Sequence, residues 1–333
     1  MSETKYFPTV EAIDKASQVL DEILEPTPFQ RNANLSDIYD AEVYLKREDL
    51  QMVRSYKIRG AYNKIRTIDP ELMKNGIVCA SAGNHAQGVA FSCSKLKIMG
   101  SIFMPVTTPR QKIEQVRMFG KEFIEIILTG DTFDAANSAA IKYAQDNNKT
   151  FIPPFDDPKV MEGQGTIGRE IFNQSKEPLD YIFVPIGGGG LASGLGAYIS
   201  RMSPSTKIIG VEPGGAPCMK AAIENGGPIK LEHIDKFVDG AAVQLAGTHT
   251  YEVCRQVLDD IVVVPEGAVC TTIIHMYNKS AIVVEPAGAL AVAALKFYKD
   301  KIKGKRVACV VSGSNNDITR MEEIREKSLL YEG

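Results

Sequence analysis

A lysine beside an aromatic residue is the first feature of this sequence that suggests chemistry. Residues 55–60 read Ser-Tyr-Lys-Ile-Arg-Gly and follow a strand-like run at residues 43–46. This order places Lys57 where a short turn should lead into a helix. Its amine is a candidate for covalent catalysis as a Schiff-base nucleophile. Most lysines are solvated surface charges, so the case for Lys57 depends on loops found elsewhere in the chain.

A second loop could hold an anion. Residues 81–88 read Ser-Ala-Gly-Asn-His-Ala-Gln-Gly after a strand-like run at residues 76–80, and a helix is expected over residues 84–96. The first N–H groups of a helix are unpaired, so they can hold a carboxylate or phosphate without a basic side chain. The alternative is a plain capping loop with Asn84 as the cap. His85 has no cysteine or carboxylate at ligand spacing, so no metal site is predicted.

A run of four glycines at residues 187–190 follows the strand-like run at residues 180–185. Glycines are costly to order and add little packing, so the run indicates a close approach of backbone to a ligand. Successive backbone N–H groups in such a turn commonly bind phosphate.

The glycine run also fits a dinucleotide site. Gly187, Gly189 and Ala192 match the dinucleotide fingerprint loosely, and Glu212 stands about 20 residues on, where a ribose-binding acid is expected. In this alternative the chain is an NAD(P)-dependent oxidoreductase. The fingerprint usually opens the first strand of a domain, however, and earlier strands are expected here.

Two further polar residues, Ser312 and Glu285, stand at the ends of elements that are expected to be buried. Ser312 opens a polar loop after the strand-like run at residues 306–311. Glu285 precedes a helical stretch of small apolar residues that must be buried. A carboxylate in that place is either a helix cap or a site residue.

The bulk composition excludes several function classes. The 333 residues are 44% hydrophobic and 24% charged, with a net charge of −3, which fits a globular protein of two domains without a nucleic-acid or membrane footprint. The six cysteines lack paired spacing, so reduced core thiols are expected rather than disulfides or zinc. Residues 1–5 carry no apolar signal core. No apolar window of about 18 residues is present, so no membrane span is expected.

Strand-like runs alternate with helical patterns along most of the chain. Near-continuous apolar strands between helices predict α/β architecture with mostly parallel sheets covered on both faces. A proline-rich stretch at residues 151–158 interrupts the alternation. We therefore predict a small α/β domain over residues 51–153 and a large one made of residues 1–50 and 154–333, with the ligand in the cleft between them.

Taken together, these loops resemble those of the fold-type II pyridoxal-phosphate enzymes, which have the tryptophan synthase β-like fold of two three-layer domains. The resemblance is greatest to the biosynthetic threonine dehydratases (threonine deaminases) of isoleucine biosynthesis, and it covers the chain from about residue 24 onward. The motifs are specific only jointly. They lie at residues 46–49, 55–62, 81–88, 187–191 and 284–289.

The resemblance implies that Lys57 holds pyridoxal 5'-phosphate covalently. Tyr56, where phenylalanine is usual, would pack beside the pyridine ring. Backbone around Ser81, Asn84 and His85 would hold the substrate carboxylate. The other implied cofactor contacts are Asn84 at the ring hydroxyl, Ser312 at the ring nitrogen, Gly187, Gly188, Gly189, Gly190 and Leu191 at the phosphate, and Gly240 and Glu285 nearby.

The implied reaction is the dehydration and deamination of L-threonine to 2-oxobutanoate and ammonia, and of L-serine to pyruvate. A serine hydroxyl can only donate to a neutral pyridine nitrogen, which favours elimination over transamination. Lys57 must be neutral to take the Cα proton, so burial should lower its pKa. The β-methyl of threonine is worth only ~1–3 kcal/mol in a pocket, so the two substrates are not ranked.

Two departures bear on the alternative of a serine racemase or serine dehydratase of the same fold. Ala82 stands where serine racemases carry a serine, which favours dehydration over racemisation. Those relatives also bind a cation through a glutamate and an aspartate, and here Glu212 is followed by Cys218 in place of the aspartate. That cation site stays open. A non-catalytic binding module with this fold is a further alternative.

The family also implies a cytoplasmic homodimer or homotetramer with a small amino-acid substrate. The sequence ends about where the linker to the regulatory domain of long threonine dehydratases would begin. We therefore expect no allosteric response of this chain to isoleucine.

Overall fold

The structure is a computed structural model that describes residues 6–331, so the expectation about residues 1–5 lies outside the described residues. Within that range the strands form a six-stranded sheet of order β1-β2-β10-β7-β8-β9 and a four-stranded sheet of order β5-β4-β3-β6. The strands of the larger sheet are β1 (Phe29–Arg31), β2 (Glu42–Arg47), β7 (Tyr181–Pro185), β8 (Lys207–Pro213), β9 (Asp260–Val264) and β10 (Arg306–Val311). Those of the smaller sheet are β3 (Ile77–Ala80), β4 (Gly100–Met104), β5 (Ile124–Leu128) and β6 (Thr150–Phe151).

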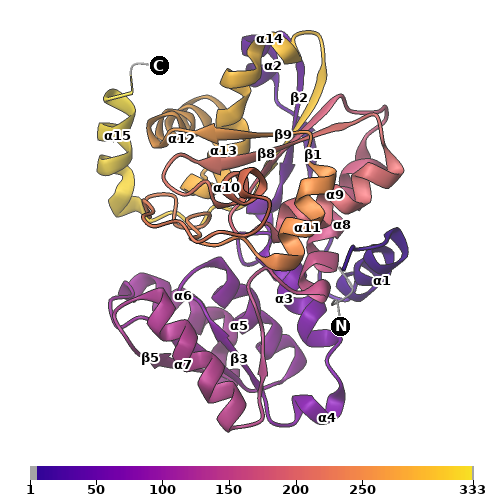
Figure 1. Cartoon of the computed structure of the whole chain (residues 1–333). Helices are drawn as coiled ribbons and strands as arrows, with labels where there is room; N and C mark the ends of the chain where they lie inside the picture. The colour runs from indigo at the N-terminus through magenta and orange to yellow at the C-terminus, as the bar shows by residue number, and fades with distance from the viewer. Residues whose placement is uncertain (1–5, 332–333) are drawn as a thin grey trace.

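Helices cover both faces of each sheet, and Figure 1 shows the two groups one above the other. Around the smaller sheet and at its junction with the larger one lie α3 (Lys57–Arg66), α4 (Pro70–Met73), α5 (Asn84–Leu96), α6 (Arg110–Gly120) and α7 (Phe133–Asp146). The other helices are α1 (Val10–Leu20), α2 (Ala33–Tyr39), α8 (Pro158–Gln174), α9 (Gly190–Met202), α10 (Cys218–Asn225), α11 (Thr248–Val257), α12 (Glu266–Ser280), α13 (Pro286–Ala293), α14 (Lys299–Ile302) and α15 (Met321–Leu329).

The strand pairing confirms the predicted class. Every named strand pair is parallel except β1 with β2, where Phe29 lies opposite Lys46. Strand β10 alternates between two cores, because Val307 packs in one cluster and Ala308 in another. Strand β3 does the same in the smaller sheet, with Ile77 and Val78 in separate clusters. Each sheet is therefore the middle of three layers, as parallel sheets require.

The predicted division of the chain falls between elements of the two sheets. All strands of the smaller sheet lie between Ile77 and Phe151, and the larger sheet takes two strands from before that range. The proline-rich stretch joins β6 to α8, whose start is capped by Asp157. The domain boundaries themselves stay a prediction. None of the helices described between residues 6 and 331 is long and apolar enough to cross a membrane.

Six free thiols are spread through these cores. All of the cysteines are buried, so they lie in the core as the sequence predicts. The loops that follow β3, β7 and β10 leave from the carboxyl ends of parallel strands, where ligands bind in α/β sheets. These three loops carry the candidate site.

Candidate active site

Lys57 is the first residue of α3, at the end of the turn that follows β2. Its Nζ donates a hydrogen bond of 2.9 Å to the carbonyl oxygen of Pro154 and lies 5.4 Å from the centroid of the Tyr56 ring. Burial lowers the pKa of Lys57 to about 8, although the carboxyl group of Glu285 acts in the opposite direction. Near neutral pH part of the amine is therefore unprotonated, which a nucleophile or base requires.

A buried network of charges fixes the helix that carries Lys57. Arg59 and Glu48 are 1% and 0% exposed, and two hydrogen bonds of 2.8 Å join the guanidinium to the carboxylate. Arg59 also donates to Glu170 of α8 at 2.6 Å, and Lys46 reaches the same carboxylate. The motif at residues 46–49 thus anchors α3 on β2 and α8. The network therefore affects the candidate site only by fixing the position of Lys57 at the start of α3.

The loop after β3 meets the loops of the larger sheet at Asn84. Its Nδ2 donates to Glu285 Oε1 at 2.6 Å, and its Oδ1 accepts from Asn315 Nδ2 at 2.7 Å. Gly83, not Asn84, is the N-cap of α5. Glu285 occupies the N-cap position of α13 but its side chain makes no capping hydrogen bond. Glu285 therefore does not cap α13 through its side chain, and its role as a cofactor contact stays a prediction.

His85 is held as a neutral ring. It is 4% exposed, and its Nε2 lies 2.9 Å from the carbonyl oxygen of Ile152. Burial, and secondly the charge of Lys57, lower the pKa of His85 to about 3. Because a carbonyl only accepts, Nε2 carries the proton. Ser81 stands nearby at the loop start and accepts the Gly83 N–H at 3.1 Å.

The glycine run forms the turn between β7 and α9. Gly189 has a φ of +94°, a left-handed conformation that favours glycine, and a Cβ there would lie 2.6 Å from Met219 Cε. A Cβ on Gly188 would collide with the ring of Phe155. Leu191 belongs to the hydrophobic core below, so it contributes its backbone only. The first N–H groups of α9 have no partner within the helix.

Three more expected residues contact other parts of the candidate site. Tyr56 packs against the core cluster that contains Leu191, and its N–H donates to Ser312 O at 3.1 Å. Ser312 is 2% exposed, and its hydroxyl donates to Ala287 O at 3.2 Å. Gly240 is exposed, and a Cβ there would lie 3.4 Å from Glu285 Oε1. All of the site residues expected from the sequence thus belong to loops that contact one another.

The proline-rich stretch is a part of the site that the sequence did not reveal. Pro154 O accepts from Lys57, and the neighbouring Ile152 O lies against His85.

The same stretch also contacts the glycine turn and the start of α11. Phe155 packs on Gly188, and Asp156 accepts the N–H groups of Thr248, His249 and Thr250. This segment therefore runs past both the lysine and the glycine turn. Its prolines predict a domain boundary. Only contacts between residues far apart in the sequence show that it also lies against the lysine and the glycine turn.

The residues present fit a phosphorylated aldehyde cofactor. Ser55 Oγ and Asn315 Oδ1 are buried without a hydrogen-bond partner among the described residues. Buried polar atoms of this kind call for a ligand or water. The candidate site also contains an amine of lowered pKa and a glycine turn at the start of α9, which suit an aldehyde carbon and a phosphate.

Glu212 cannot serve as the ribose-binding acid of the dinucleotide alternative. It is 0% exposed, and its carboxyl oxygens accept the N–H groups of Met219 at 2.7 Å and Lys220 at 2.9 Å. Both acceptor atoms are therefore used to hold the start of α10. Among residues 6–331 no group of three or more metal-binding side chains converges.

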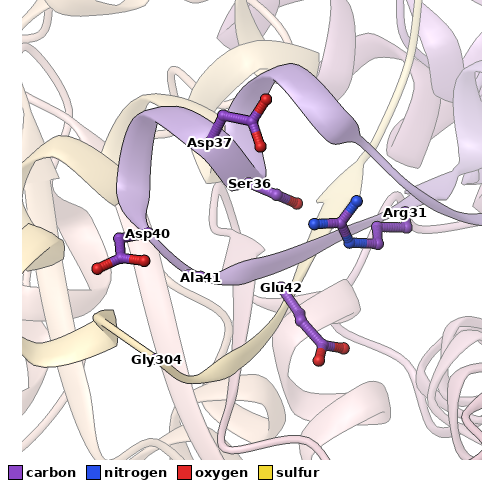
Figure 2. A pocket seen from close by; sticks show the side chains of 7 residues that line it. All are labelled: Arg31, Ser36, Asp37, Asp40, Ala41, Glu42 and Gly304. Carbon is purple, nitrogen blue, oxygen red and sulfur yellow. The ribbon is translucent and has the colours of Figure 1, made fainter.

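A hollow lies at the amino ends of β2 and β10 (Figure 2). It is lined by Arg31, Ser36, Asp37, Asp40, Ala41, Glu42 and Gly304. Glu42 is the first residue of β2, and Gly304 lies just before β10. Both are therefore at the opposite end of these strands from the loops of the candidate site. The acidic side chains point in different directions (Figure 2), and Asp40 and Glu42 pair with Lys303 and Arg306. This hollow presents no convergent donor set.

Comparisons with known proteins agree with the site. The sequence model of a family described as pyridoxal-phosphate dependent enzyme matches residues 20–313. A biosynthetic L-threonine dehydratase of Halalkalibacterium halodurans is 58% identical over 324 residues, which cover 97% of this chain and 78% of that protein.

Solved structures give the same result. The processed form of threonine deaminase isoform 2 from Solanum lycopersicum has a TM-score of 0.91 and 37% identity, over 97% of this chain and 91% of that one. Maize serine racemase has a TM-score of 0.89 and 28% identity, over 98% and 99%. The resemblance stated from the sequence motifs is confirmed. The chain belongs to the pyridoxal-phosphate-dependent enzymes and, within them, to the biosynthetic threonine dehydratases.

Proposed function

We propose that this chain converts L-threonine to 2-oxobutanoate and ammonia with pyridoxal 5'-phosphate, and that it also accepts L-serine. The observation that carries the proposal is the placement of Lys57. Its amine, with a pKa lowered to about 8 by burial, shares the segment Pro154–Phe155 with the glycine turn. A carbonyl-reactive amine and a phosphate-type turn on one segment suit this cofactor.

The cofactor would supply an electron sink that stabilises negative charge at the substrate Cα. Lys57 holds it covalently, and the glycine turn with the start of α9 binds its phosphate. Tyr56 would pack beside the ring and Asn84 would meet the ring hydroxyl. Ser312 would donate to the ring nitrogen once its hydroxyl turns away from Ala287 O. Glu285 lies next to Asn84, from which it accepts a hydrogen bond, and Gly240 lies next to Glu285. Both residues would therefore lie near the cofactor ring.

The substrate carboxylate binds at the start of α5, where the loop from Ser81 to His85 presents free N–H groups. His85 is neutral and donates to Ile152 O, so it shapes this loop without acting as a base. Lys57, once its amine is free and neutral, takes the proton from the substrate Cα. The Lys57 ammonium can return that proton to the β-hydroxyl, which then leaves as water. The enamine product takes up one water molecule and gives the 2-oxo acid and ammonia.

The cofactor and substrate lie between the domain of residues 51–153 and the domain of residues 1–50 and 154–333. The enzyme acts in the cytoplasm as a homodimer or homotetramer. Ala82 offers no hydroxyl at the place where serine racemases carry a serine, so dehydration outpaces racemisation.

The test combines a spectrum with a product assay. The purified protein should show a visible absorption band that changes on adding L-threonine, and it should release 2-oxobutanoate. Borohydride reduction and peptide mapping should locate the cofactor on Lys57. Lys57→Ala should lower kcat by at least about 10³-fold, whereas Lys74→Ala, at a side chain that is 67% exposed, should not change it. A colourless protein that gains no band with added cofactor would overturn the proposal.

A further inference from the structure

We propose that Thr250, Cys218 and Cys254 are positioning residues that aim the N–H groups of the glycine turn at the cofactor phosphate. This inference rests on the proposed function, because it assigns the turn to the phosphate. Each of the three side chains lies outside the turn, on α10 or α11. Each of them donates to a different carbonyl oxygen of the turn.

The three contacts follow one another along the chain. Cys218 Sγ donates to Gly187 O at 3.4 Å, with the carboxyl group of Glu212 as a second acceptor. Thr250 Oγ1 donates to Gly188 O at 2.6 Å, with Gly247 O farther away at 3.2 Å. Cys254 Sγ donates to Gly189 O at 3.8 Å. Three consecutive carbonyl groups are thus bound by side chains from two helices. Backbone groups bind two of these carbonyls as well, since Gly188 O accepts the N–H of Gly247 at 3.4 Å and Gly189 O accepts that of Ser193 at 2.9 Å.

Tethering a carbonyl also fixes the next N–H group. In a trans peptide the C=O of one residue and the N–H of the next lie in one plane and point in opposite directions. Binding the carbonyls of residues 187–189 on the side of α10 and α11 therefore directs the N–H groups of residues 188–190 to the other side. Glycine has no side chain to limit rotation of these peptides, so the tethers supply the order that the sequence of the turn lacks.

Thr250 is the strongest of the three tethers. Its hydroxyl is a better donor than a thiol, and its hydrogen bond is fully buried. Asp156 fixes its position by accepting the first N–H groups of α11, including that of Thr250 at 3.1 Å. The two thiols stay protonated, and so remain donors, because burial raises the pKa values of Cys218 and Cys254.

The inference predicts an effect that depends on the phosphate. Dissociation constants of the apoprotein should be measured for pyridoxal phosphate and for pyridoxal, which lacks the phosphate. Thr250→Val keeps the shape of the side chain but removes the donor. It should weaken binding of pyridoxal phosphate by about tenfold, the effect of one buried hydrogen bond, and leave binding of pyridoxal unchanged. Thr250→Ser keeps the donor and should stay within about twofold of the wild type.

Cys218→Ala applies the same test at a second tether and should reduce the preference for the phosphorylated form by about two- to threefold, since thiols are weak donors. Thermal unfolding of each apoprotein identifies variants that lose the fold. Equal weakening of both ligands, or no weakening, by Thr250→Val would overturn the inference and leave the proposed function intact. A wild type that binds neither ligand would refute the proposed function as well.

Discussion

The amide of Asn84 donates a hydrogen bond of 2.6 Å to the carboxyl group of Glu285, which lies 201 residues further along the chain. Burial raises the pKa of Glu285 to about 7, with Asp239 acting in the same direction and Asn84 against it. The contact joins the loop after β3 to the start of α13, so it connects the two sheets at the site. Glu285 also lies close enough to influence the charge of Lys57.

The ionisation of Lys57 should respond to Glu285. Only the neutral amine attacks an aldehyde, so the rate at which the apoprotein takes up pyridoxal phosphate should rise with pH, with a midpoint near the pKa of about 8. The negative charge of Glu285 raises that pKa. Glu285→Gln should therefore move the midpoint to lower pH and speed uptake at neutral pH. Stopped-flow absorbance across pH 6 to about 10 measures both.

Glu71→Gln is the matched control, because that side chain is 76% exposed and remote from the site. Its midpoint should equal that of the wild type. An unchanged midpoint in Glu285→Gln would mean that the carboxyl is protonated over this whole range, or that its charge does not reach the amine.

Two glycines of the site should respond to alanine in opposite ways. A methyl at Gly188 would collide with Phe155, whereas a methyl at Gly83 would meet no atom within 4 Å. Gly188→Ala should destabilise the fold by about 1–3 kcal/mol, as overpacking does, and weaken cofactor binding. Gly83→Ala should keep the melting temperature but raise KM for threonine about tenfold, because the added methyl would occupy open space in the loop proposed to bind the substrate carboxylate. A lower melting temperature for Gly83→Ala, or a normal one for Gly188→Ala, would contradict this.

The sequence could predict the elements but not how their ends meet. The burial of β10 on both faces and the helix that begins at Lys57 follow from local patterns. The contact of Asn84 with Glu285 joins residues far apart in the chain, and no local pattern records it. Thr250 was missed for the same reason, because a threonine near a helix start is ordinary until its acceptor, Gly188 O, is known. Only the combination of motifs, through the family resemblance, predicts that these loops form one site.

The charge network below Lys57 should be sensitive to the loss of one partner. Arg59→Met would leave the fully buried carboxylate of Glu48 without its cation. Such a change costs about 3–5 kcal/mol in other buried pairs. Arg66 lies on the same helix and pairs with Glu22 at the surface, with both side chains more than 40% exposed. Arg66→Ala should cost less than about 1 kcal/mol. Urea unfolding of both variants measures the difference, and equal losses would contradict the prediction.

Glu212 should make the stability of the protein fall as the pH rises through mildly acidic values. Burial raises the pKa of Glu212 to about 7 from its ordinary 4.5, against the hydrogen bonds from Met219 and Lys220. Between those two pH values the folded chain keeps a proton that the unfolded chain has released. Stability falls with rising pH wherever the folded state binds more protons. The loss belonging to Glu212 is on the order of 3 kcal/mol by pH 7.

Glu212→Gln removes this titration and keeps one acceptor for the start of α10. Its free energy of unfolding should therefore change less between pH 4.5 and 7 than that of the wild type, whatever constant difference the lost second acceptor causes. Comparing slopes separates the two effects. Glu114→Gln, at a side chain that is 56% exposed, should follow the wild-type slope. Parallel curves for wild type and Glu212→Gln would show that water reaches this carboxyl group and that it ionises normally.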